Sequence, residues 1–322
     1  MKIIDRCKNI NKLLNDTSMV FVVSHRDLDL DALGSCLAMY QYADNLGKTV
    51  YLILDDKKKE KSVARVFDEL DESFRVISSA RAKEIKNKDS LLIVLDTNKN
   101  YLLQTPNIDA EFDKKIVIDH HDIGNGTIED GEIIVDIDAS STCEMITMFL
   151  KLNKFTIDSN LATVLLSGII LDTNNYTLKT DSDTFFYSHY LTTCGANPNK
   201  VQYLLKQDLK KYIKRQKMIT NVKLINNIAI TKGVVKEIYR SEELAKTADS
   251  LLLFDGIEAS FVIAHIDKNT IGISARSMGK INVGQVLSMF DGGGDVNFAA
   301  AKINDVTISK VEQELLNIIR LL

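Results

Sequence analysis

Short apolar runs of strand character alternate with longer stretches of helical periodicity over the first 190 residues. In the longer stretches, apolar residues recur every three or four positions, which is the period of a helix with a buried face. Strands that alternate with helices form a mainly parallel sheet with flanking helices, so an α/β fold is predicted. The predicted strands are 19–24, 49–54, 90–95 and 115–118, and the predicted helices are 32–46, 141–152 and 161–171.

A change of pattern near residue 195 indicates two domains, as the length of 322 residues also suggests. Gly195–Asn199 combines glycine, asparagine and proline, which interrupt regular structure. The next residues, 201–221, read as one long helix with a mixed charged face. Strands are indicated in 222–235, 259–267 and 270–276, and a helical run starts near Ser309. We predict a catalytic domain at 1–195, a helical linker at 196–221 and a smaller mixed α/β domain at 222–322.

Charge and composition exclude several classes of protein. The net charge of −4 argues against a broad basic surface for long nucleic acids, although a local pocket could bind a small anion. The four cysteines form no CxxC pair, so neither a zinc ribbon nor a redox motif is indicated. No apolar run reaches the roughly 18 residues of a membrane span. We expect a cytoplasmic chain without a membrane segment, and the helical pattern of its first residues favours a natural beginning.

Acidic residues and histidines directly follow four of the apolar runs. These residues are His25, Asp27, Asp29 and Asp31, then Asp96, then Asp119, His120 and His121, and finally Asp172. Open α/β sheets build their sites at the carboxyl ends of the strands, so a single rim could collect all of these side chains. Any one of the acids could instead be a helix cap or a turn residue. Caps and turns do not account for the whole set, because three of the five histidines fall in two of these loops.

The chemistry of this set points to divalent metal ions. Oxygen and imidazole ligands without thiolate suit Mn²⁺ or Mg²⁺, whereas a structural zinc site normally contains cysteine. Clustered carboxylates would repel one another without cations. Two ions about 3.5–4 Å apart can share a bridging carboxylate and promote attack of a hydroxide on phosphorus. The pattern therefore predicts a two-metal site that hydrolyses a phosphate ester.

The order and spacing of these residues resemble the successive motifs of the DHH phosphoesterase superfamily. The matching residues are His25, Asp29 and Asp31 in a His-x3-Asp-x-Asp motif, then Asp96, then Asp119-His120-His121, and then Asp172. Spacing alone does not choose Asp29 and Asp31 over Asp27, and the family pattern makes that choice. The resemblance implies one metal bound by His25, Asp29 and Asp96, and a second bound by Asp31, Asp96, His120 and Asp172.

The same resemblance implies three catalytic residues. Asp96 would bridge the two metals, Asp119 would support the site, and His121 would contact the substrate phosphate. The implied cofactors are two divalent ions, Mn²⁺ in the first place and Mg²⁺ or Co²⁺ as alternatives.

The second half of the chain resembles the DHH-associated domain, which binds the rest of a nucleotide substrate. The implied substrate-binding residues are His121 of the first domain with Ser274, Arg276, Ser277, Gly292, Gly293 and Gly294. Arg276 can hold a phosphate with two parallel hydrogen bonds, or it can form a surface salt bridge. The glycines are expected to precede a helical alanine-rich stretch, whose N-terminus could receive a phosphate, or to form a plain turn.

Longer segments look like the catalytic half of membrane-tethered cyclic-di-AMP phosphodiesterases of the GdpP type. These segments are 139–145, 167–180, 248–264 and 273–283. The likeness implies hydrolysis of cyclic-di-AMP to pApA, and therefore a role in nucleotide signalling. Two alternatives stay open, namely an oligoribonuclease and pAp phosphatase that acts on short linear nucleotides, and a metal-retaining regulator that binds a nucleotide without turnover. The chain could form a homodimer under each of these three interpretations.

One position departs from the family pattern. The glycine motif of the family ends in a histidine that touches the substrate, and this chain has Asp295 there, with Phe298 in place of the usual asparagine. A carboxylate about 4 Å from a phosphate would cost on the order of 4 kcal/mol at an effective dielectric constant of 20. We therefore expect hydrolysis to persist while substrate preference shifts, and Asp295→His to lower the KM for cyclic-di-AMP.

Overall fold

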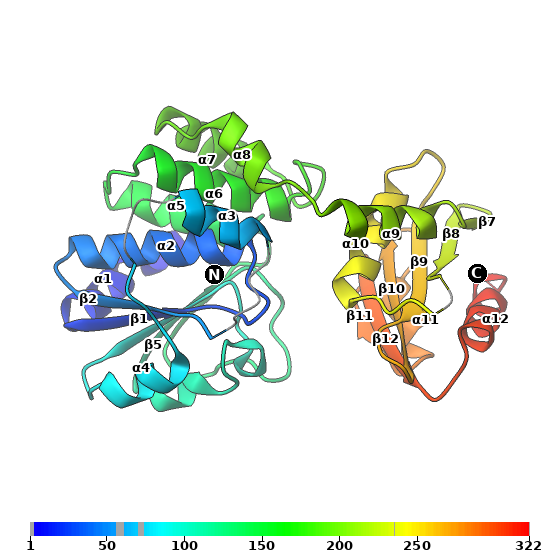
Figure 1. The fold of residues 1–322 in the computed structure, drawn as a ribbon, viewed down its shortest axis with the longest axis horizontal. Helices are drawn as coiled ribbons and strands as arrows, with labels where there is room; N and C mark the ends of the chain where they lie inside the picture. The colour runs from blue at the N-terminus through cyan, green and yellow to red at the C-terminus, as the bar shows by residue number, and fades with distance from the viewer. Residues whose placement is uncertain (1–2, 56–60, 70–73, 235, 322) are drawn as a thin grey trace. The chain divides into compact units, whose positions relative to one another are not determined.

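The computed structural model describes residues 3–55, 61–69, 74–234 and 236–321. It contains two compact units, Met1–Lys206 and Gln207–Leu322 (Figure 1). The elements of the first unit are η1 (Ile3–Arg6), α1 (Cys7–Asn15), β1 (Met19–Val23), α2 (Leu30–Asn45), β2 (Thr49–Ile53), α3 (Lys61–Glu69), β3 (Val76–Ile77), α4 (Ser79–Ile85), β4 (Leu91–Leu95), η2 (Asn100–Leu102), η3 (Ile108–Glu111), β5 (Lys114–Asp119), β6 (Glu132–Val135), α5 (Thr142–Leu152), α6 (Ser159–Asp172), α7 (Ser182–Thr193) and α8 (Pro198–Leu204).

The described strands of the first unit form one parallel sheet in the order β3-β2-β1-β4-β5-β6. The predicted α/β class is confirmed, and all four predicted strands are present as β1, β2, β4 and β5. The short edge strands β3 and β6 were not predicted. Strand β1 pairs with both β2 and β4, so the direction in which strands are added reverses between β1 and β4. Open α/β sheets bind ligands at such a switch point.

Two hydrophobic cores cover the two faces of this sheet. Val20 and Val22 of β1 pack into the core that contains α1, α2, α5 and α6. Phe21 and Val23 point to the opposite face, where α4 and the segment between β4 and β5 pack. In Figure 1 the sheet accordingly lies between α2 with α5–α8 on one side and α4 on the other. Burial on both faces explains why these strands are continuous apolar runs in the sequence.

The second unit has a mixed sheet in the order β11-β12-β10-β9-β8-β7. Strands β8 and β9 are parallel, and the other described pairs are antiparallel. The predicted mixed α/β character of this part is therefore confirmed. Its elements are α9 (Leu209–Ile219), β7 (Lys223–Ile225), β8 (Ile228–Lys232), α10 (Ser241–Leu252), β9 (Ala259–His265), β10 (Thr270–Ser277), α11 (Val283–Ser288), β11 (Gly293–Gly294), β12 (Phe298–Asn304) and α12 (Ile308–Ile319).

The prediction of a single helix over 201–221 is wrong. The structure has two helices there, α8 and α9, and the chain divides into its two compact units between Lys206 and Gln207. Asp208 starts the second helix, because its carboxylate accepts the backbone N–H groups of Lys210 and Lys211. Apolar periodicity continues across this break, so the pattern alone did not reveal it.

The expected helix after the glycines is also wrong, because those residues form strand β12. Gly293 and Gly294 pair with Ala300 and Ala299 in a hairpin. Ala299 and Ala301 are buried whereas Ala300 is exposed, which is the two-residue period of a strand. Pairing with β10 outweighs the helix propensity of alanine here. A phosphate-binding helix N-terminus therefore does not follow Gly292–Gly294.

Within the described ranges, no helix combines the length and the hydropathy that a membrane span requires.

Candidate metal centre

The first group of candidate ligands lies at the switch point of the parallel sheet. His25 follows β1 and Asp96 follows β4, and His25 Nε2 is 3.3 Å from Asp96 Oδ2. Asp29 completes the group, with one ligand atom from each residue within 4.8 Å of the others. Asp96 adopts a left-handed backbone conformation with φ of 58°, which asparagine and aspartate tolerate best among residues with a side chain.

Asp29 and Asp31 at the start of α2 belong to the ligand groups, whereas Asp27 in the preceding loop does not. Asp29 is the N-cap of α2, and its Oδ1 accepts the N–H groups of Asp31 and Ala32, each at 3.0 Å. The cap of this helix is thus Asp29, whereas the sequence suggests Asp31 as a possible cap. Capping leaves the second carboxylate oxygen of Asp29 for another partner. Asp27 is exposed and belongs to none of the ligand groups that the described residues form. Geometry therefore favours Asp29 and Asp31, as the family pattern does.

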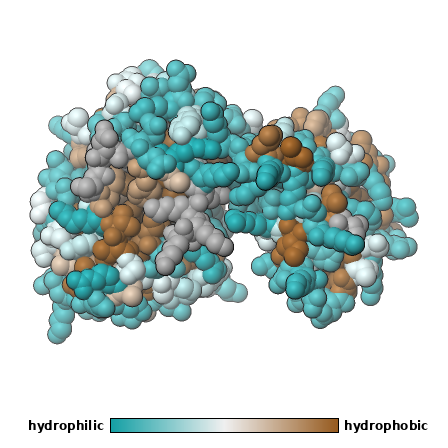
Figure 2. Space-filling model, in the orientation of Figure 1, coloured by the Kyte–Doolittle hydropathy of each residue, from teal (hydrophilic) through white to brown (hydrophobic). Residues whose placement is uncertain are grey.

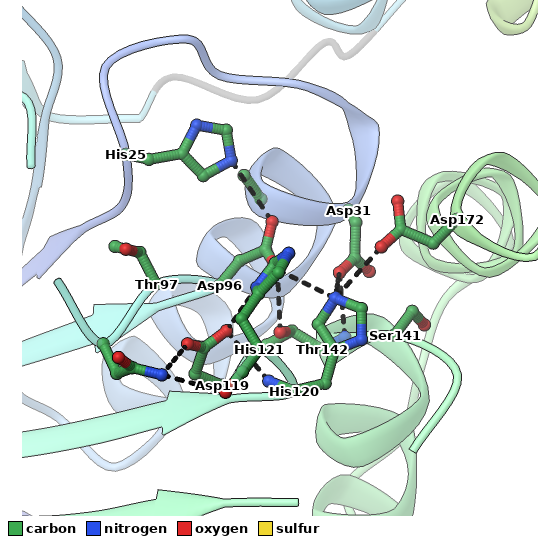
Figure 3. A network of polar contacts seen from close by, with 12 residues as sticks. His25, Asp31, Asp96, Thr97, Asp119, His120, His121, Ser141, Thr142 and Asp172 are labelled. Carbon is green, nitrogen blue, oxygen red and sulfur yellow. Dashed lines mark hydrogen bonds and ion pairs between the residues drawn. The ribbon is translucent and has the colours of Figure 1, made fainter. Parts of the chain in front are cut away.

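The second group surrounds the buried ring of His120, as Figure 3 shows. His120 Nε2 is 3.1 Å from Asp172 Oδ2, 3.5 Å from Asp96 Oδ1 and 4.0 Å from Asp31 Oδ2. Asp172 is the last residue of α6, and Asp31 is fully buried in the first turn of α2. Within the described part of the chain, both ring nitrogens of His120 are buried without a hydrogen bond.

Asp31 and Asp96 are held by the start of α5, which sequence reasoning missed. The N–H of Thr142 donates to Asp31 Oδ2 at 2.8 Å, and the N–H of Cys143 donates to Asp31 Oδ1 at 2.7 Å. The Thr142 hydroxyl donates to Asp96 Oδ1 at 3.0 Å. A threonine in the first turn of a helix is ordinary, so nothing in the sequence pattern marked it as a partner of the site.

We expect Thr142→Val to weaken divalent-metal binding by about 10- to 100-fold, the usual effect of removing a group that orients a ligand. Valine keeps the shape of threonine and removes only the hydroxyl that orients Asp96. Thr142→Ser keeps that hydroxyl and is the matched control. Metal titration of both variants by calorimetry makes the comparison. Equal affinities in the two variants would show that this hydrogen bond does not position the carboxylate.

Asp119 links the histidines instead of facing a ligand group. Its Oδ1 accepts the N–H of His120 and Nδ1 of His121, both at 2.8 Å, and its Oδ2 accepts the amide of Asn98 at 2.7 Å. A carboxylate only accepts, so His121 Nδ1 carries the proton and Nε2 remains for another partner. The His121 side chain is 55% exposed. Asn98, which also donates to the His121 carbonyl at 3.0 Å, is a second supporting residue that sequence reasoning did not assign.

In the group of His25, Asp29 and Asp96, burial and a neighbouring opposite charge act in opposite directions on the pKa values of His25 and of Asp29. Burial would lower the pKa of His25, but the hydrogen bond to Asp96 and the charge of Asp29 raise it to about 9. Burial raises the pKa of Asp29 to about 7, against the opposing charge of His25. These shifts are those of buried groups that depend on one another for charge compensation.

Around His120, burial and neighbouring charges also act on the pKa values of Asp31 and Asp96, and the shifts are larger. Burial, followed by the charges of Asp96 and Asp172, raises the pKa of Asp31 well above its usual value. Burial acts in the same direction on Asp96, but the neighbouring imidazoles of His120 and His25, 3.5 and 3.3 Å away, hold the pKa of that carboxyl well below its usual range. Asp31 thus has too few positive partners for a buried carboxylate. A divalent cation would supply the missing charge.

The arrangement fits divalent metal ions by three observations. It has a buried imidazole without a hydrogen bond, carboxylates that converge on it, and no thiolate among the grouped ligands. Oxygen and imidazole donors of this kind suit Mn²⁺, Mg²⁺ or a similar ion. Asp96 belongs to groups on both sides, so it is the one predicted ligand that could serve two ions.

The predicted substrate residues of the second half lie in the second unit, on β10, on β11 and at Gly292, which directly precedes β11. Arg276 Nε donates to Asp249 Oδ1 at 2.6 Å, and its guanidinium also reaches the Ala275 carbonyl and the Ser274 hydroxyl. The salt-bridge reading is therefore present in the structure, with a partly buried Asp249 as the partner. Burial raises the pKa of Asp249, which the charge of Arg276 opposes.

Two of the three glycines are required by the fold, and one is not. A Cβ on Gly292 would lie 2.5 Å from the Ala300 carbonyl oxygen, and Gly294 has φ of 145°. A Cβ on Gly293 would meet nothing within 4 Å. Packing within the second unit thus gives no reason for glycine at 293. Close approach of a ligand to the backbone is the usual remaining reason.

A parallel sheet with histidines and carboxylates at its switch point defines an α/β protein with a candidate divalent-metal centre. The chain matches the DHH family N-terminal domain over residues 19–169 and the DHHA1 domain over residues 224–322. It therefore belongs to the DHH superfamily. Within that superfamily the chain is related to proteins of the GdpP type, as its curated relatives show.

Two curated relatives are similar along almost the whole chain. It is 35% identical over 315 residues to the cyclic-di-AMP phosphodiesterase GdpP of Geobacillus thermodenitrificans, covering 95% of this chain and 48% of that protein. It is 32% identical to the cyclic-di-AMP phosphodiesterase PdeA of Listeria monocytogenes, covering 96% of this chain and 48% of that protein. The chain thus spans about half the length of these relatives.

A solved structure shares the fold. An exopolyphosphatase-related protein from Bacteroides fragilis superposes with a TM-score of 0.78 at 20% identity, covering 97% of this chain and 96% of that one. At this identity the likeness concerns the fold alone.

Proposed function

We propose that the chain is a phosphodiesterase that uses two divalent metal ions to open cyclic-di-AMP to the linear dinucleotide pApA. The observation that carries the proposal is that the DHH ligand residues gather around His25 and around His120, with the Asp96 carboxylate between them, 3.3 Å from His25 Nε2 and 3.5 Å from His120 Nε2. Similarity to two cyclic-di-AMP phosphodiesterases over both domains supports the substrate.

The two groups suggest how the ions would be held. One ion would be bound by His25, Asp29 and Asp96, and the other by Asp31, Asp96, His120 and Asp172. Close ligand atoms of His25, Asp29 and Asp96 support the first set, and those of Asp31, His120 and Asp172 support the second. Asp96 adjoins the second set through Oδ1, which is 3.5 Å from His120 Nε2. Asp96 Oδ2 faces His25 whereas Oδ1 faces His120, which suits a carboxylate that bridges two ions. Mn²⁺ is the proposed ion, with Mg²⁺ and Co²⁺ as alternatives.

When bound, the ions would polarise the phosphodiester and lower the pKa of a coordinated water. The residues of the chain would orient the reacting groups. His121, fixed by Asp119 through Nδ1, would offer Nε2 to a nonbridging phosphate oxygen. Asp119 itself would not touch the substrate, because its carboxylate is fully buried and accepts from three donors. Asp96 would thus bind metal, His121 would contact the substrate phosphate, and Asp119 would orient His121.

The second unit would bind the remainder of the dinucleotide. Gly293 of β11 leaves its backbone accessible, and Ser274, Arg276 and Ser277 lie on β10, which is separated from β11 by β12. Asp249 holds the Arg276 guanidinium through Nε, which would fix the direction in which the remaining N–H groups point.

Product analysis tests the proposal. Purified, metal-depleted protein is supplied with Mn²⁺, Mg²⁺ or Co²⁺ and then incubated with cyclic-di-AMP, cyclic-di-GMP, pApA or pAp. We expect pApA to accumulate from cyclic-di-AMP, with Mn²⁺ giving the fastest reaction. If cyclic-di-AMP stays intact while pApA is degraded to AMP, the protein is an oligoribonuclease instead. Nucleotide binding without any turnover would indicate the regulatory alternative.

Asp295 has a structural role that refines the prediction made from the sequence. Its Oδ1 accepts the N–H groups of Asn297 and Phe298, at 2.6 and 3.0 Å, within the β11–β12 turn. Asp295→Asn keeps an accepting oxygen and removes the charge, whereas Asp295→His also changes the turn.

We expect Asp295→Asn to lower the KM for cyclic-di-AMP by roughly three- to tenfold, because an exposed carboxylate repels phosphate through screened charge. Asp295→His should lower the KM at least as much if the turn tolerates it. Steady-state kinetics of the three proteins provide the measurement. An unchanged KM in both variants would mean that this side chain does not face the substrate.

A further inference from the structure

The second unit contains a groove that is separate from its predicted substrate residues. Its volume is about 1010 Å³, and it lies between α9, the segment before α10, the β9–β10 turn and the end of β12. Six cationic side chains line it, against three carboxylates, on a chain whose net charge is negative. The cations are Lys210, Lys211, Lys214, Lys217, Arg240 and Lys302.

Helix α9 presents the cations as a row. Lys210, Lys214 and Lys217 are spaced by four and three residues, so they share one face of the helix. At 1.5 Å per residue, the seven steps from Lys210 to Lys217 correspond to about 10 Å along the helix. Lys302 of β12 and Arg240 line the same groove from other elements. Figure 2 shows a largely hydrophilic surface in the region of α9, with a few hydrophobic residues among it.

In the described part of the chain, half of these six cations make no ion pair with neighbouring carboxylates, whereas the charges of Lys211 and Arg240 act on Glu242. Lys214 lies 3.7 Å from Glu237 and 3.8 Å from Glu243, so two of the three carboxylates are already engaged with it. Among the residues that the structure describes, the ammonium groups of Lys210, Lys217 and Lys302 make no ion pair. Lys210 and Lys217 at the two ends of the row, and Lys302 on β12, therefore keep exposed positive charge that an anion could bind.

The groove lies at the opposite end of the second sheet from Arg276 and the glycines. Thr270, which lines the groove, starts β10 and pairs with Asn304 at the end of β12. Arg276 lies six residues further along β10, and Gly293 and Gly294 pair with the beginning of β12. Six residues of strand span about 20 Å. A ligand of the groove would therefore not compete for the predicted substrate residues of this unit.

The lining also indicates which ligand chemistry is suitable. Tyr239, the one aromatic residue in the described lining, is 1% exposed, and Lys214 Nζ lies 4.0 Å from its ring centroid. The groove thus offers no free ring on which a base could stack, which is what single-stranded nucleic acids generally require. The row of lysines on α9 is about 10 Å long, which is longer than one phosphate and similar to the length of a short chain of phosphates.

We propose that this groove binds a linear chain of phosphates, either inorganic or as the tail of a nucleoside triphosphate. Lys210, Lys211 and Lys217 of α9 would contact successive phosphates, and Lys302 and Arg240 would contact them from the other sides. This site does not depend on the proposed phosphodiesterase activity, because none of its residues belongs to the metal groups or to β11.

Calorimetric titration of the full chain with tripolyphosphate tests the proposal. The ligand is supplied as its magnesium complex, so that it does not extract ions from the metal centre. The test variant carries Lys210→Gln and Lys217→Gln. The control variant carries Lys88→Gln and Lys310→Gln, which remove the same charge from exposed positions outside the groove. We expect the groove variant to bind at least about tenfold more weakly than wild type and the control to bind as wild type does.

A nucleoside triphosphate and a single-stranded oligonucleotide are titrated in parallel. Tighter binding of the triphosphate than of tripolyphosphate would identify a nucleotide as the ligand, and equal binding would identify the phosphate chain itself. Three results would overturn the proposal: no binding of either, equal binding in the groove and control variants, or an oligonucleotide that binds more tightly than both.

Discussion

Asp96→Asn is expected to abolish hydrolysis and to leave the protein without a pair of bound metal ions. Asp96 is the only residue of the described site that belongs to groups around both His25 and His120. Metal activation supplies several kcal/mol to phosphoryl chemistry, and each 1.36 kcal/mol is a factor of ten, so kcat should fall by on the order of 1,000-fold. Asparagine tolerates the positive φ of 58° at this position, so the fold should survive.

Metal content by mass spectrometry and product formation are measured together for this variant. Asp27→Asn is the matched control, because Asp27 is an exposed carboxylate in the loop that carries His25 and Asp29. The control should keep both metal ions and nearly all activity. Full activity of Asp96→Asn, or two bound ions in it, would refute the bridging role.

Gly168→Ala is expected to destabilise the first unit and to weaken metal binding. A Cβ at this position of α6 would lie 2.5 Å from Cys143 Sγ and 2.9 Å from the Cα of Asp31. Overpacking of this kind costs about 1–3 kcal/mol, which corresponds to roughly 2–10 °C in Tm for a unit of this size. Because the displaced residue is a candidate ligand, we also expect the divalent-metal affinity to fall by more than about tenfold.

The sign of the stability change makes this variant informative. Helix propensity alone favours alanine over glycine by about 1 kcal/mol, so propensity and packing predict opposite shifts in Tm. Adding Cys143→Ala removes the nearest of the overlapping atoms and should recover part of the lost stability. Thermal unfolding with and without metal separates the two effects. A higher Tm with unchanged metal affinity would mean that α6 can move away from Asp31 at no cost.

The parts of the fold that depend on burial could be predicted from the sequence. Strands β1, β2, β4 and β5 have apolar sequences because helices cover both faces of the sheet. The edge strand β6 was missed because it is short and half-buried, and β12 because its alanines favour a helix until they pair with β10. The break before α9 depends on the cap at Asp208, which does not interrupt the apolar pattern.

The candidate ligands could be predicted because their order along the chain is itself a pattern. Their supports could not, because Thr142, Asn98 and Gly168 are common residues in unremarkable local positions. Each of them acts across a large sequence separation, such as the 46 residues between Thr142 and Asp96. Only the folded chain brings such partners within hydrogen-bonding distance.

The two backbone N–H groups that α5 donates to Asp31 affect how mutational data on this chain should be interpreted. A scan that exchanges side chains one at a time leaves both donors in place, whatever residues stand at 142 and 143. Such a scan would therefore underestimate the contribution of α5. Relatives could likewise vary at these positions and retain the same support, so a variable position here would not mean a dispensable one.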